Sequence, residues 1–403
     1  MYLLMYKNNP VLSFSKKDQN GVFLDRENLP FALKNEKDAY DAMRGFCASR
    51  IMLMNREYSK EILTSCGIED QSPLNICLLG RGLSFRDNYW IKEDGSDETW
   101  EKVNLYDNPF SREISYTALT GESTSVTIGD GLYTGELTNR GTRTKCLFSQ
   151  NDNIFLAKAE TDKEISAEIL SGQLNGILRI RAAAYIKTEV YGKQCSVCRI
   201  ATSPRREMIP CRDVLQYCGG RMKMGSPYYN LFMAKDPINF VKMQIFDYLT
   251  LNTDRNRDNF ALEEMDGLVT GLYPLYDHDS CFKGLSEKAV YFVTGLPFDE
   301  SMTRLRLQYK RQYDEAMEQL MPGLKRMEKE GSYLFDDIGL KNSFDGFMER
   351  VEKCLSSDII KNINSPEKAA IKPLSGTADL KNIRVHIEGD EDPDSDDFIG
   401  LGK

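Results

Sequence analysis

The change from strand patterns to helix patterns along this 403-residue chain restricts its fold more than any other feature. Between about residues 123 and 200, apolar and polar residues alternate as in half-buried strands, with one helical pattern over TDKEISAEILSGQLNGI. From residue 236 onward helical spacing dominates, and Asp266-Gly267 marks a hairpin between the helices. The sequence therefore predicts an α+β fold of two lobes, a small β-rich lobe followed by a helical lobe.

Two further regions flank these lobes. The first begins with a period-two run, YLLMYKNNPVLSF, and a second short run after Asn20-Gly21, which together predict a β-hairpin followed by two helices. Residues 71–110 hold both Trp residues and are rich in Asn, Asp and Gly, which predicts a long loop-like stretch ordered by packing. Seven acids between Glu388 and Asp397 predict a disordered tail. The expected regions are an α+β accessory region over 1–110, the β-rich lobe over 111–202, the helical lobe over 203–365 and the acidic tail over 366–403.

The charge and hydropathy of the chain exclude several function classes. It has 61 Asp+Glu against 52 Lys+Arg, a formal charge of −9, which disfavours direct nucleic-acid binding. No segment approaches the roughly 18 apolar residues of a membrane-spanning helix, and the opening MYLLMYKNN lacks the basic flank of a signal peptide. We therefore expect a cytoplasmic protein that does not bind a membrane.

The ten cysteines predict neither a disulfide framework nor a zinc site. Cys195 and Cys198 have CxxC spacing, but Cys211 and Cys218 do not repeat it. The first pair also lies in an alternating strand pattern, so its two side chains would point to opposite faces. We interpret these thiols as reduced residues of a cytosolic protein's core.

A group of acidic and amide residues in the helical half has the spacing of a phosphoryl-transfer site. Asp254 stands five residues before Asn259, and Asp277 follows 18 residues later, after the predicted hairpin. Phosphoryl transfer needs an oriented hydroxyl nucleophile and Mg²⁺ to neutralise the phosphates. An Asp five residues before a metal-binding Asn, then a second metal-binding Asp, is the order that protein kinases use. The pattern predicts Asp254 as the catalytic residue and Asn259 and Asp277 as metal ligands.

The β-rich half supplies basic residues ahead of that site. The loop LTNRGTRTKCLFSQN, residues 137–151, contains Arg140, Arg143 and Lys145 and no acid, and Gly141 and nearby hydroxyls suit close approach to phosphates. Lys158 ends an apolar strand pattern and could neutralise phosphates. On the next helix, either Glu164 or Glu168 could hold Lys158, and Glu168 is favoured by its more apolar turn. The basic loop, lysine, carboxylate and acidic loop follow in the order of a bilobal kinase.

With these pieces, the chain resembles the HipA-type serine/threonine kinases, whose fold is related to phosphatidylinositol kinases. The matching segments are GTRTK before FLAKA, TDRNRDNFAL and YPLYD, within a resemblance that covers about residues 1–330. It implies that ATP lies between the lobes, with its phosphates near Gly141, Thr142, Arg143, Lys145 and Lys158. It also implies that adenine rests against QCSVCRIAT, with the hinge at Arg199–Ala201.

The same resemblance implies regulation and partners. In that family a loop equivalent to residues 138–150 closes over ATP, and autophosphorylation of its serine ejects the loop. Thr142, Thr144 and Ser149 are the candidates here, although none coincides with that serine. Toxins of this type often pair with a DNA-binding antitoxin.

These features predict an ATP- and Mg²⁺-dependent kinase that acts on Ser or Thr of a protein substrate. Two alternatives stay open at this point. The chain could be a nucleotide-binding pseudokinase or regulatory module, or a small-molecule or lipid kinase on the same fold. The intact Asp254, Asn259, Asp277 and Lys158 argue against the pseudokinase, and the lack of an apolar membrane-docking segment argues against a lipid substrate.

Overall fold

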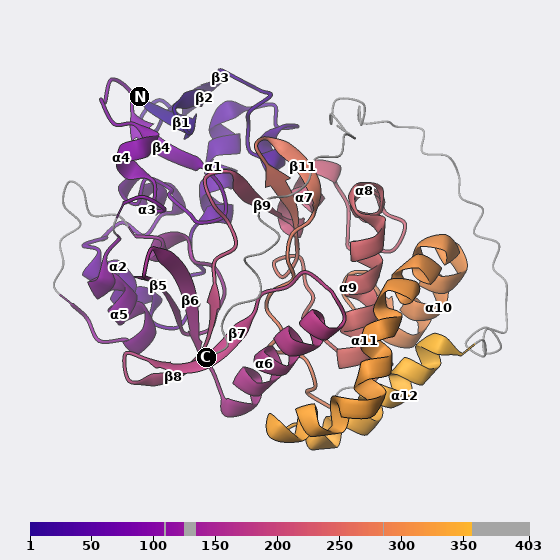
Figure 1. The fold of residues 1–403 in the computed structure, drawn as a ribbon. Coiled ribbons are helices and arrows are strands. Elements are labelled where there is room, and N and C mark those ends of the chain that lie inside the picture. The colour runs from indigo at the N-terminus through magenta and orange to yellow at the C-terminus, as the bar shows by residue number, and fades with distance from the viewer. Residues whose placement is uncertain (109, 125–133, 285, 357–403) are drawn as a thin grey trace.

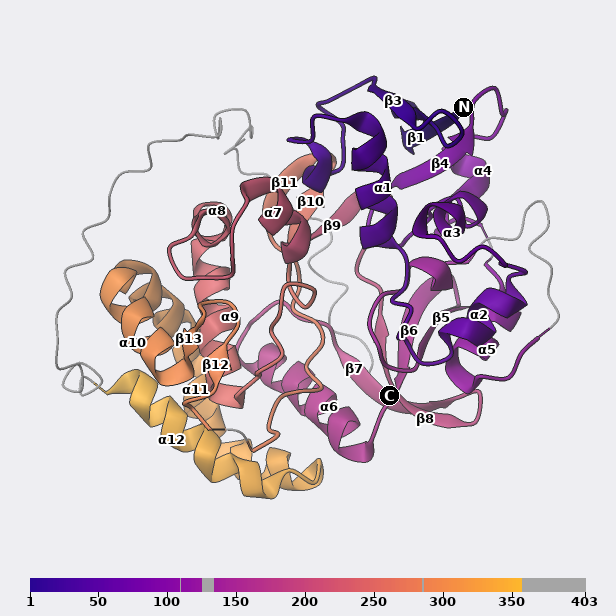
Figure 2. The same ribbon diagram turned by 180° about the vertical axis from the view of Figure 1, so that it is seen from behind.

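The protein has a β-rich part and a helical part that lie side by side (Figures 1 and 2). The computed structural model describes residues 1–108, 110–124, 134–284 and 286–356. The predicted acidic tail over 366–403 lies outside these residues. Within them, no helix combines the length and apolar character needed to span a bilayer.

The N-terminal sheet joins strands that are distant in sequence. Its order is β3-β2-β1-β4, and every pair is antiparallel. The strands are β1 (Tyr2–Tyr6), β2 (Asn9–Ser15), β3 (Asn20–Phe23) and β4 (Tyr89–Glu93). The connection from β3 to β4 contains helices α1 (Ala39–Arg50), α2 (Ser59–Ser65) and α3 (Pro73–Leu79), and α4 (Trp100–Val103) and α5 (Arg112–Thr120) follow β4.

A second four-stranded sheet carries the basic loop and Lys158. Its order is β5-β6-β8-β7, again antiparallel. The elements are β5 (Lys145–Gln150), β6 (Asn153–Ala159), α6 (Asp162–Ile177), β7 (Tyr185–Val190) and β8 (Lys193–Arg199). Helix α6 lies between this sheet and the helical part in both views (Figures 1 and 2). Its approach to the helical part is close, because a Cβ at Gly323 would collide with the backbone of Ile177.

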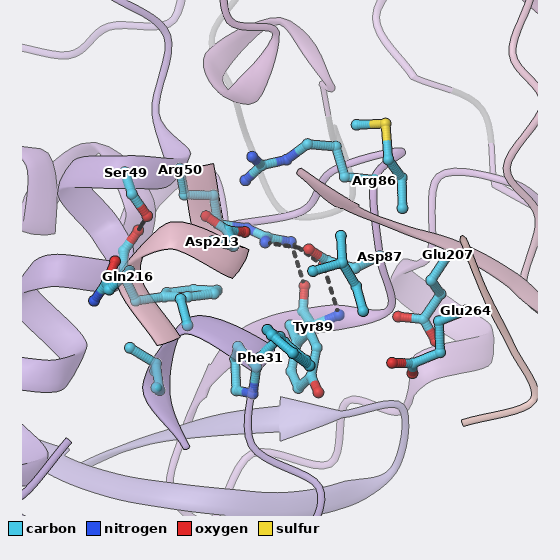
Figure 3. Close-up of a pocket in the computed structure, with 16 residues that line it drawn as sticks. Phe31, Ser49, Arg50, Arg86, Asp87, Tyr89, Glu207, Asp213, Gln216 and Glu264 are labelled. Atoms are coloured by element: carbon cyan, nitrogen blue, oxygen red, sulfur yellow. Dashed lines mark hydrogen bonds and ion pairs between the residues drawn. The ribbon is translucent and has the colours of Figure 1, made fainter. Parts of the chain in front are cut away.

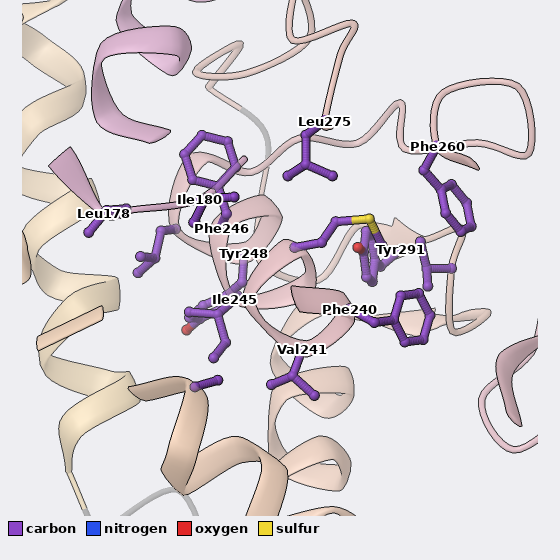
Figure 4. Packing of buried hydrophobic residues seen from close by; sticks show 14 of the residues in the cluster. Leu178, Ile180, Phe240, Val241, Ile245, Phe246, Tyr248, Phe260, Leu275 and Tyr291 are labelled. Carbon is purple, nitrogen blue, oxygen red and sulfur yellow. The ribbon is translucent and has the colours of Figure 1, made fainter. Parts of the chain in front are cut away.

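The helical part is built around one buried helix. Helix α9 (Pro237–Thr250) is buried on every side from Phe240 to Thr250 and contributes Phe240, Ile245 and Phe246 to the packing in Figure 4. Its other helices are α7 (Cys211–Cys218), α8 (Pro227–Lys235), α10 (Phe298–Gln308), α11 (Lys310–Asp337) and α12 (Phe344–Leu355). A three-stranded sheet of order β11-β10-β9 and a short β12-β13 pair complete the helical part. Their strands are β9 (Arg206–Pro210), β10 (Ala261–Met265), β11 (Leu268–Leu272), β12 (Val290–Tyr291) and β13 (Leu296–Pro297). Three short 3₁₀ helices are η1 (Phe31–Leu33), η2 (Glu136–Thr138) and η3 (Lys341–Ser343).

The accessory region and the second sheet share one hydrophobic cluster. That cluster runs from Leu4 and Phe14 in the first sheet to Ala157 and Val197 in the second. The two sheets are therefore packed as one unit, and the boundary at residue 110 stays a prediction.

Several local predictions differ from the structure. The single run over residues 2–14 is broken by a turn at Lys7-Asn8 into β1 and β2. The stretch 71–110 is not loop-like, since it holds α3, β4 and α4. Strand β4 pairs with β1, more than 80 residues earlier, and a local pattern cannot reveal such a partner. The strand-like alternation predicted from about residue 123 lies outside the described residues at 125–133, and Glu136–Thr138 is a 3₁₀ helix.

The clustered cysteines occupy separate elements. Cys195 and Cys198 are buried in β8, whereas Cys211 begins α7 and Cys218 ends it. All ten cysteines are free thiols.

Candidate active site

Lys158 is placed by a strand that runs directly into a helix. It lies near the end of β6, opposite Lys145 on β5 and Ser196 on β8. Three residues after Lys158, Thr161 caps α6, and its hydroxyl accepts the Glu164 amide N–H while the Glu164 side chain accepts the Thr161 N–H. This capping box fixes the direction of α6 from its first turn, so that the second turn faces Lys158.

The Lys158 ammonium joins the two lobes. Its Nζ donates to Oε1 of Glu168 at 2.6 Å and to Oδ1 of Asp277 at 2.5 Å. Burial alone would lower the pKa of Lys158, but Asp277 and Glu168 hold it well above its usual range. We call Lys158, Glu168 and Asp277 the cleft network.

The structure distinguishes the two glutamates that the sequence left open. Glu164 is engaged in the capping box and also pairs with Arg143 at 3.0 Å and Lys283 at 3.3 Å. Glu168 is fully buried, and its second oxygen accepts the Ser196 hydroxyl. Lys158 is therefore paired with Glu168.

Asp277 approaches from the other lobe in an unusual backbone conformation. Its φ is +61°, a region that non-glycine residues seldom adopt. Its N–H donates to the Tyr185 hydroxyl of β7 at 2.9 Å, which stabilises this conformation. Although burial would raise the pKa of Asp277, Lys158 lowers it to about 2, so the carboxylate is charged at neutral pH.

The loop after α9 holds Asp254 and Asn259 together. The Asn259 amide Nδ2 donates to the Asp254 carbonyl at 2.7 Å and to its Oδ2 at 3.2 Å, and Asn256 donates to Oδ1 at 2.8 Å. Burial, together with the negative charges of Asp277 and Asp279, raises the pKa of Asp254. Asp254, Asn259 and Asp277 thus lie in one acidic region of the cleft.

Arg255 ties the two acidic loops to α9, and the sequence analysis did not identify it. Its guanidinium pairs with the Asp247 carboxylate at 3.0 Å, and both side chains are fully buried. The same group donates to the Asn259 carbonyl at 2.7 Å and to the Tyr276 carbonyl at 2.6 Å. One side chain therefore sets the positions of Asn259 and Asp277 relative to each other.

A second unpredicted residue, Glu160, lies beside the cleft network. Its Oε1 lies 3.9 Å from the Lys158 Nζ, and its Oε2 accepts the Ser196 hydroxyl at 3.2 Å. The buried Oε1 has no hydrogen-bond partner among the residues that the structure describes. Burial raises the pKa of Glu160 to about 8. No sequence signal distinguishes this residue from an ordinary exposed acid at a strand end.

The basic loop surrounds its own lysine. Lys145 is buried, its Nζ donates to the Arg140 carbonyl, and burial lowers the pKa of Lys145 to about 8. Gly141 has a φ of +111°, and a Cβ there would collide with the Lys145 ammonium. Glycine is therefore required at this position for the loop to fold over Lys145.

The remaining predicted residues differ in exposure. Thr142, Arg143 and Ser149 are exposed, whereas Thr144 is buried and donates its hydroxyl to Glu57. Arg199 ends β8 opposite Phe155, and Ala201 lies just beyond it on the connection to β9. The expected hinge therefore lies on the connection between the second sheet and the helical part.

The acidic region suits a hard cation bound jointly with a phosphate. The described residues contain no cluster of three or more His, Cys, Asp or Glu side chains that could cage a metal. Mg²⁺ typically takes one or two protein oxygen ligands and completes its shell with water and substrate phosphates. Both Asn259 Nδ2 bonds go to Asp254, so the Asn259 Oδ1 is left as an acceptor. Arg255 bonds the carbonyls of Asn259 and of Tyr276, the residue before Asp277, so an amide oxygen and a charged carboxylate from two linked segments fit such a site.

Known proteins resemble this chain in structure. HipA of Shewanella oneidensis MR-1, from a toxin–antitoxin complex with HipB and operator DNA, matches with a TM-score of 0.56 and 13% identity, over 88% of this chain and 96% of that one. The chain has the fold of HipA. The HipA-like bilobal α+β fold predicted from the sequence is thereby confirmed. The Helicobacter pylori proinflammatory kinase CtkA also matches, with a TM-score of 0.42 and 12% identity, over 54% of this chain and 91% of that one. Neither a scan against protein-family models nor a search of curated proteins finds a match.

Proposed function

We propose that the protein is an ATP-dependent serine/threonine protein kinase of HipA type. The observation that carries this proposal is the cleft network, in which one buried lysine bonds a helix carboxylate from one lobe and Asp277 from the other. Kinases need this lysine–glutamate pair and the acidic metal ligand in place together.

Each residue then has a role in the transfer. Lys158, held by Glu168, neutralises the phosphates of ATP, and Asn259 and Asp277 hold Mg²⁺. When bound there, the cation would neutralise negative charge on the phosphates. Asp254 orients the substrate hydroxyl and accepts its proton as the oxygen attacks the γ-phosphorus, and the bond from that phosphorus to the β–γ bridging oxygen breaks to release ADP. The raised pKa of Asp254 makes it a better proton acceptor than an ordinary aspartate.

The basic loop and the hinge complete the nucleotide site in this proposal. Gly141, Thr142, Arg143 and Lys145 cover the phosphates, and the segment from Arg199 to Ala201 borders the adenine. Among the candidates for autophosphorylation, exposed Thr142 and Ser149 are accessible, whereas Thr144 is buried against Glu57.

A toxin role with a DNA-binding antitoxin partner is part of the same proposal. Its support is that the structurally similar HipA was solved with HipB and operator DNA. Expression of the chain alone, with and without the product of the adjacent gene, tests this role through growth arrest and its relief.

The activity is tested by transfer of ³²P from [γ-³²P]ATP and Mg²⁺ to the protein itself and to proteins of a host lysate. We expect labelling by the wild type and none by Asp254→Ala or Asp277→Ala. Asp266→Ala is the matched control, because Asp266 is an exposed carboxylate on the β10–β11 turn, paired with Arg205. This control should label like the wild type.

Two outcomes would contradict the proposal. Equal labelling by the wild type and both cleft variants would show that these residues do not carry the reaction. ATP binding in a thermal-shift titration, without transfer to any acceptor, would instead indicate a pseudokinase.

A further inference from the structure

Four arginines from four separate segments gather on one flank of the loop after α9, residues 251–260, which is the catalytic loop of the proposed kinase. Arg86 precedes β4, Arg140 lies in the basic loop, Arg212 is in the first turn of α7 and Arg257 is in the catalytic loop itself. We call these four residues the flank cluster. None of them has a role in the phosphoryl transfer described above.

Arg212 links the cluster to the catalytic loop. Its backbone N–H donates to the Arg257 carbonyl at 2.9 Å, and its Nη1 bonds Asp258 at 2.5 Å. Its Nε contacts Asp213 at 3.3 Å. The cluster is therefore attached to the loop that presents Asp254.

Arg140 reaches the same place from the basic loop. Its Nη1 donates to the carbonyls of Ser49 at 2.8 Å and Ile51 at 3.0 Å, at the end of α1. These acceptors are neutral, so the charge of Arg140 is not cancelled by them. Burial and the positive charges of Arg212 and Arg257 lower the pKa of Arg140 to about 10, as expected for neighbouring cations.

Arg86 contributes a guanidinium that the protein does not satisfy. It lines a cavity of about 40 Å³ together with Ser49, Arg50, Asp87 and Asp213. Figure 3 shows Arg86 directed toward the end of the cavity that holds Arg50 and Asp213, away from Glu207 and Glu264. Its Nε and Nη1 are buried without a hydrogen-bond partner among the described residues, and an unsatisfied buried donor is costly.

The nearby carboxylates do not balance this charge. Asp87 is bonded by Arg50 through two N–H groups, at 2.6 and 2.8 Å, and Asp213 and Asp258 are bonded by Arg212. Counting Arg50 with the cluster gives five positive and three negative groups, or 5 − 3 = +2, in a chain of net −9. Within the described residues, Arg86, Arg140 and Arg257 form no ion pair.

Two acids, Glu207 and Glu264, lie at the other end of the cavity. They face each other across β9 and β10, and burial raises the pKa of Glu207 to about 7.

We infer that the flank cluster binds acidic side chains of the protein substrate close to the Ser or Thr that is phosphorylated. This inference rests on the proposed kinase function and names its substrate class. Arginine guanidinium groups are suited to carboxylates because they offer paired N–H donors. A local excess of two charges favours a few carboxylates over a nucleic acid, whose binding requires contacts to many phosphates.

Two fluorescent peptides test the inference without ATP. One carries a central Ser flanked by Glu, and the other carries the same Ser flanked by Gln. By fluorescence anisotropy we expect the Glu peptide to bind the wild type about tenfold more tightly. Arg86→Ala and Arg257→Ala should remove most of this preference. Arg326→Ala, an exposed arginine of α11 paired with Glu330, should keep it.

Two further measurements keep the test interpretable. Melting temperatures show whether Arg86→Ala still folds, and Arg257→Ala provides a second variant because Arg257 is exposed. The ratio of kcat/KM for phosphorylation of the two peptides should follow the ratio of their affinities.

Equal affinity for both peptides would overturn the inference, as would retention of the preference in both arginine variants. Tighter binding of a single-stranded RNA, lost in the same variants, would also overturn it in favour of a nucleic-acid site. Phosphorylation of both peptides without preference would leave the kinase function standing. Selective binding without any transfer would contradict the kinase function and leave the acidic-peptide site standing.

Discussion

Two ion networks meet at Tyr276 and Asp277 and differ in their surroundings, because Arg255 of one donates to the Tyr276 carbonyl and Asp277 belongs to the other. In the cleft network, Lys158 joins Glu168 and Asp277, residues from different lobes. In the loop after α9, Arg255 pairs with Asp247, only eight residues earlier. The Asp277 side chain is 26% exposed, whereas those of Asp247 and Arg255 are 0% exposed.

Because of this difference in exposure, we expect the cleft network to exchange hydrogen-bond partners with a ligand and the Asp247–Arg255 pair to keep its partners. Asp247 also accepts the Tyr291 hydroxyl at 2.7 Å and the Asn252 amide at 3.2 Å, so its bonding capacity is filled by the protein. We expect Asp277 to release Lys158 to a phosphate, because the Asp277 side chain is partly exposed to solvent. We therefore expect substitutions in the first network to affect activity and substitutions in the second to affect stability.

The largest expected effect is on activity in the cleft network. Asp277→Asn keeps the size of the side chain but removes the charge that holds Lys158 and the cation, so phosphoryl transfer should fall by ~10³-fold or more. Single-turnover transfer from labelled ATP measures this loss. An Asn variant with activity near that of the wild type would show that Asp277 is not a metal ligand.

The next effect is on stability in the buried pair. Asp247→Ala leaves the Arg255 guanidinium buried without its carboxylate, which should lower the free energy of unfolding by about 3–5 kcal/mol. Chemical denaturation compares this variant with Asp277→Asn, whose free energy of unfolding should change far less. Similar losses in both variants would remove the distinction between the two networks.

Of the two α6 glutamates considered as partners of Lys158, only Glu168 belongs to the cleft network, and substitutions of the two should differ in effect. Glu168→Gln removes the charge that positions Lys158 and should lower kcat/KM by about 10- to 100-fold. Glu164→Gln is the matched control, because an uncharged Gln can still form the capping box. A larger loss of activity in Glu164→Gln than in Glu168→Gln would reverse the assignment.

The smallest effect is a pH dependence from Glu160. Because the pKa of Glu160 is raised to about 8 in the folded protein, the folded state holds a proton that the unfolded state has lost above about pH 4.5. The contribution of Glu160 to the free energy of unfolding is therefore fully present below pH 4.5. It is lost as the pH rises toward 8, by at most about 1.4 kcal/mol per pH unit.

Glu160→Gln cannot titrate and isolates that contribution. The free energy of unfolding of the wild type, minus that of Glu160→Gln, should fall between pH 5 and pH 8. A difference that stays constant over this range would show that Glu160 has an ordinary pKa.

The features of the fold and site that depend on short segments could be predicted from the sequence. The spacing of Asp254, Asn259 and Asp277 and the lysine at the end of an apolar strand pattern are visible in short segments. The choice of Glu168 over Glu164 depends on the capping box, which engages Glu164. The capping box follows from the start of α6 at Asp162, which the structure shows.

The remaining features depend on contacts between distant residues. Asp247 lies in an apolar helical run, and its pairing with Arg255 follows from how the loop after α9 turns back. Strand β4 needs β1 as a partner, and the flank cluster combines residues from positions 86 to 257. No pattern within a short segment indicates such convergence.

The central claim is that Asp254 directs a protein hydroxyl onto the γ-phosphate of ATP in this cleft. Phosphoamino-acid analysis after reaction with [γ-³²P]ATP and Mg²⁺ tests it most directly. The wild type is compared with Asp254→Asn, and equal melting temperatures of the two proteins show that the variant is folded. We expect phosphoserine or phosphothreonine with the wild type and only background with the variant. Equal protein labelling by both, or label found only in small molecules or lipids, would contradict it.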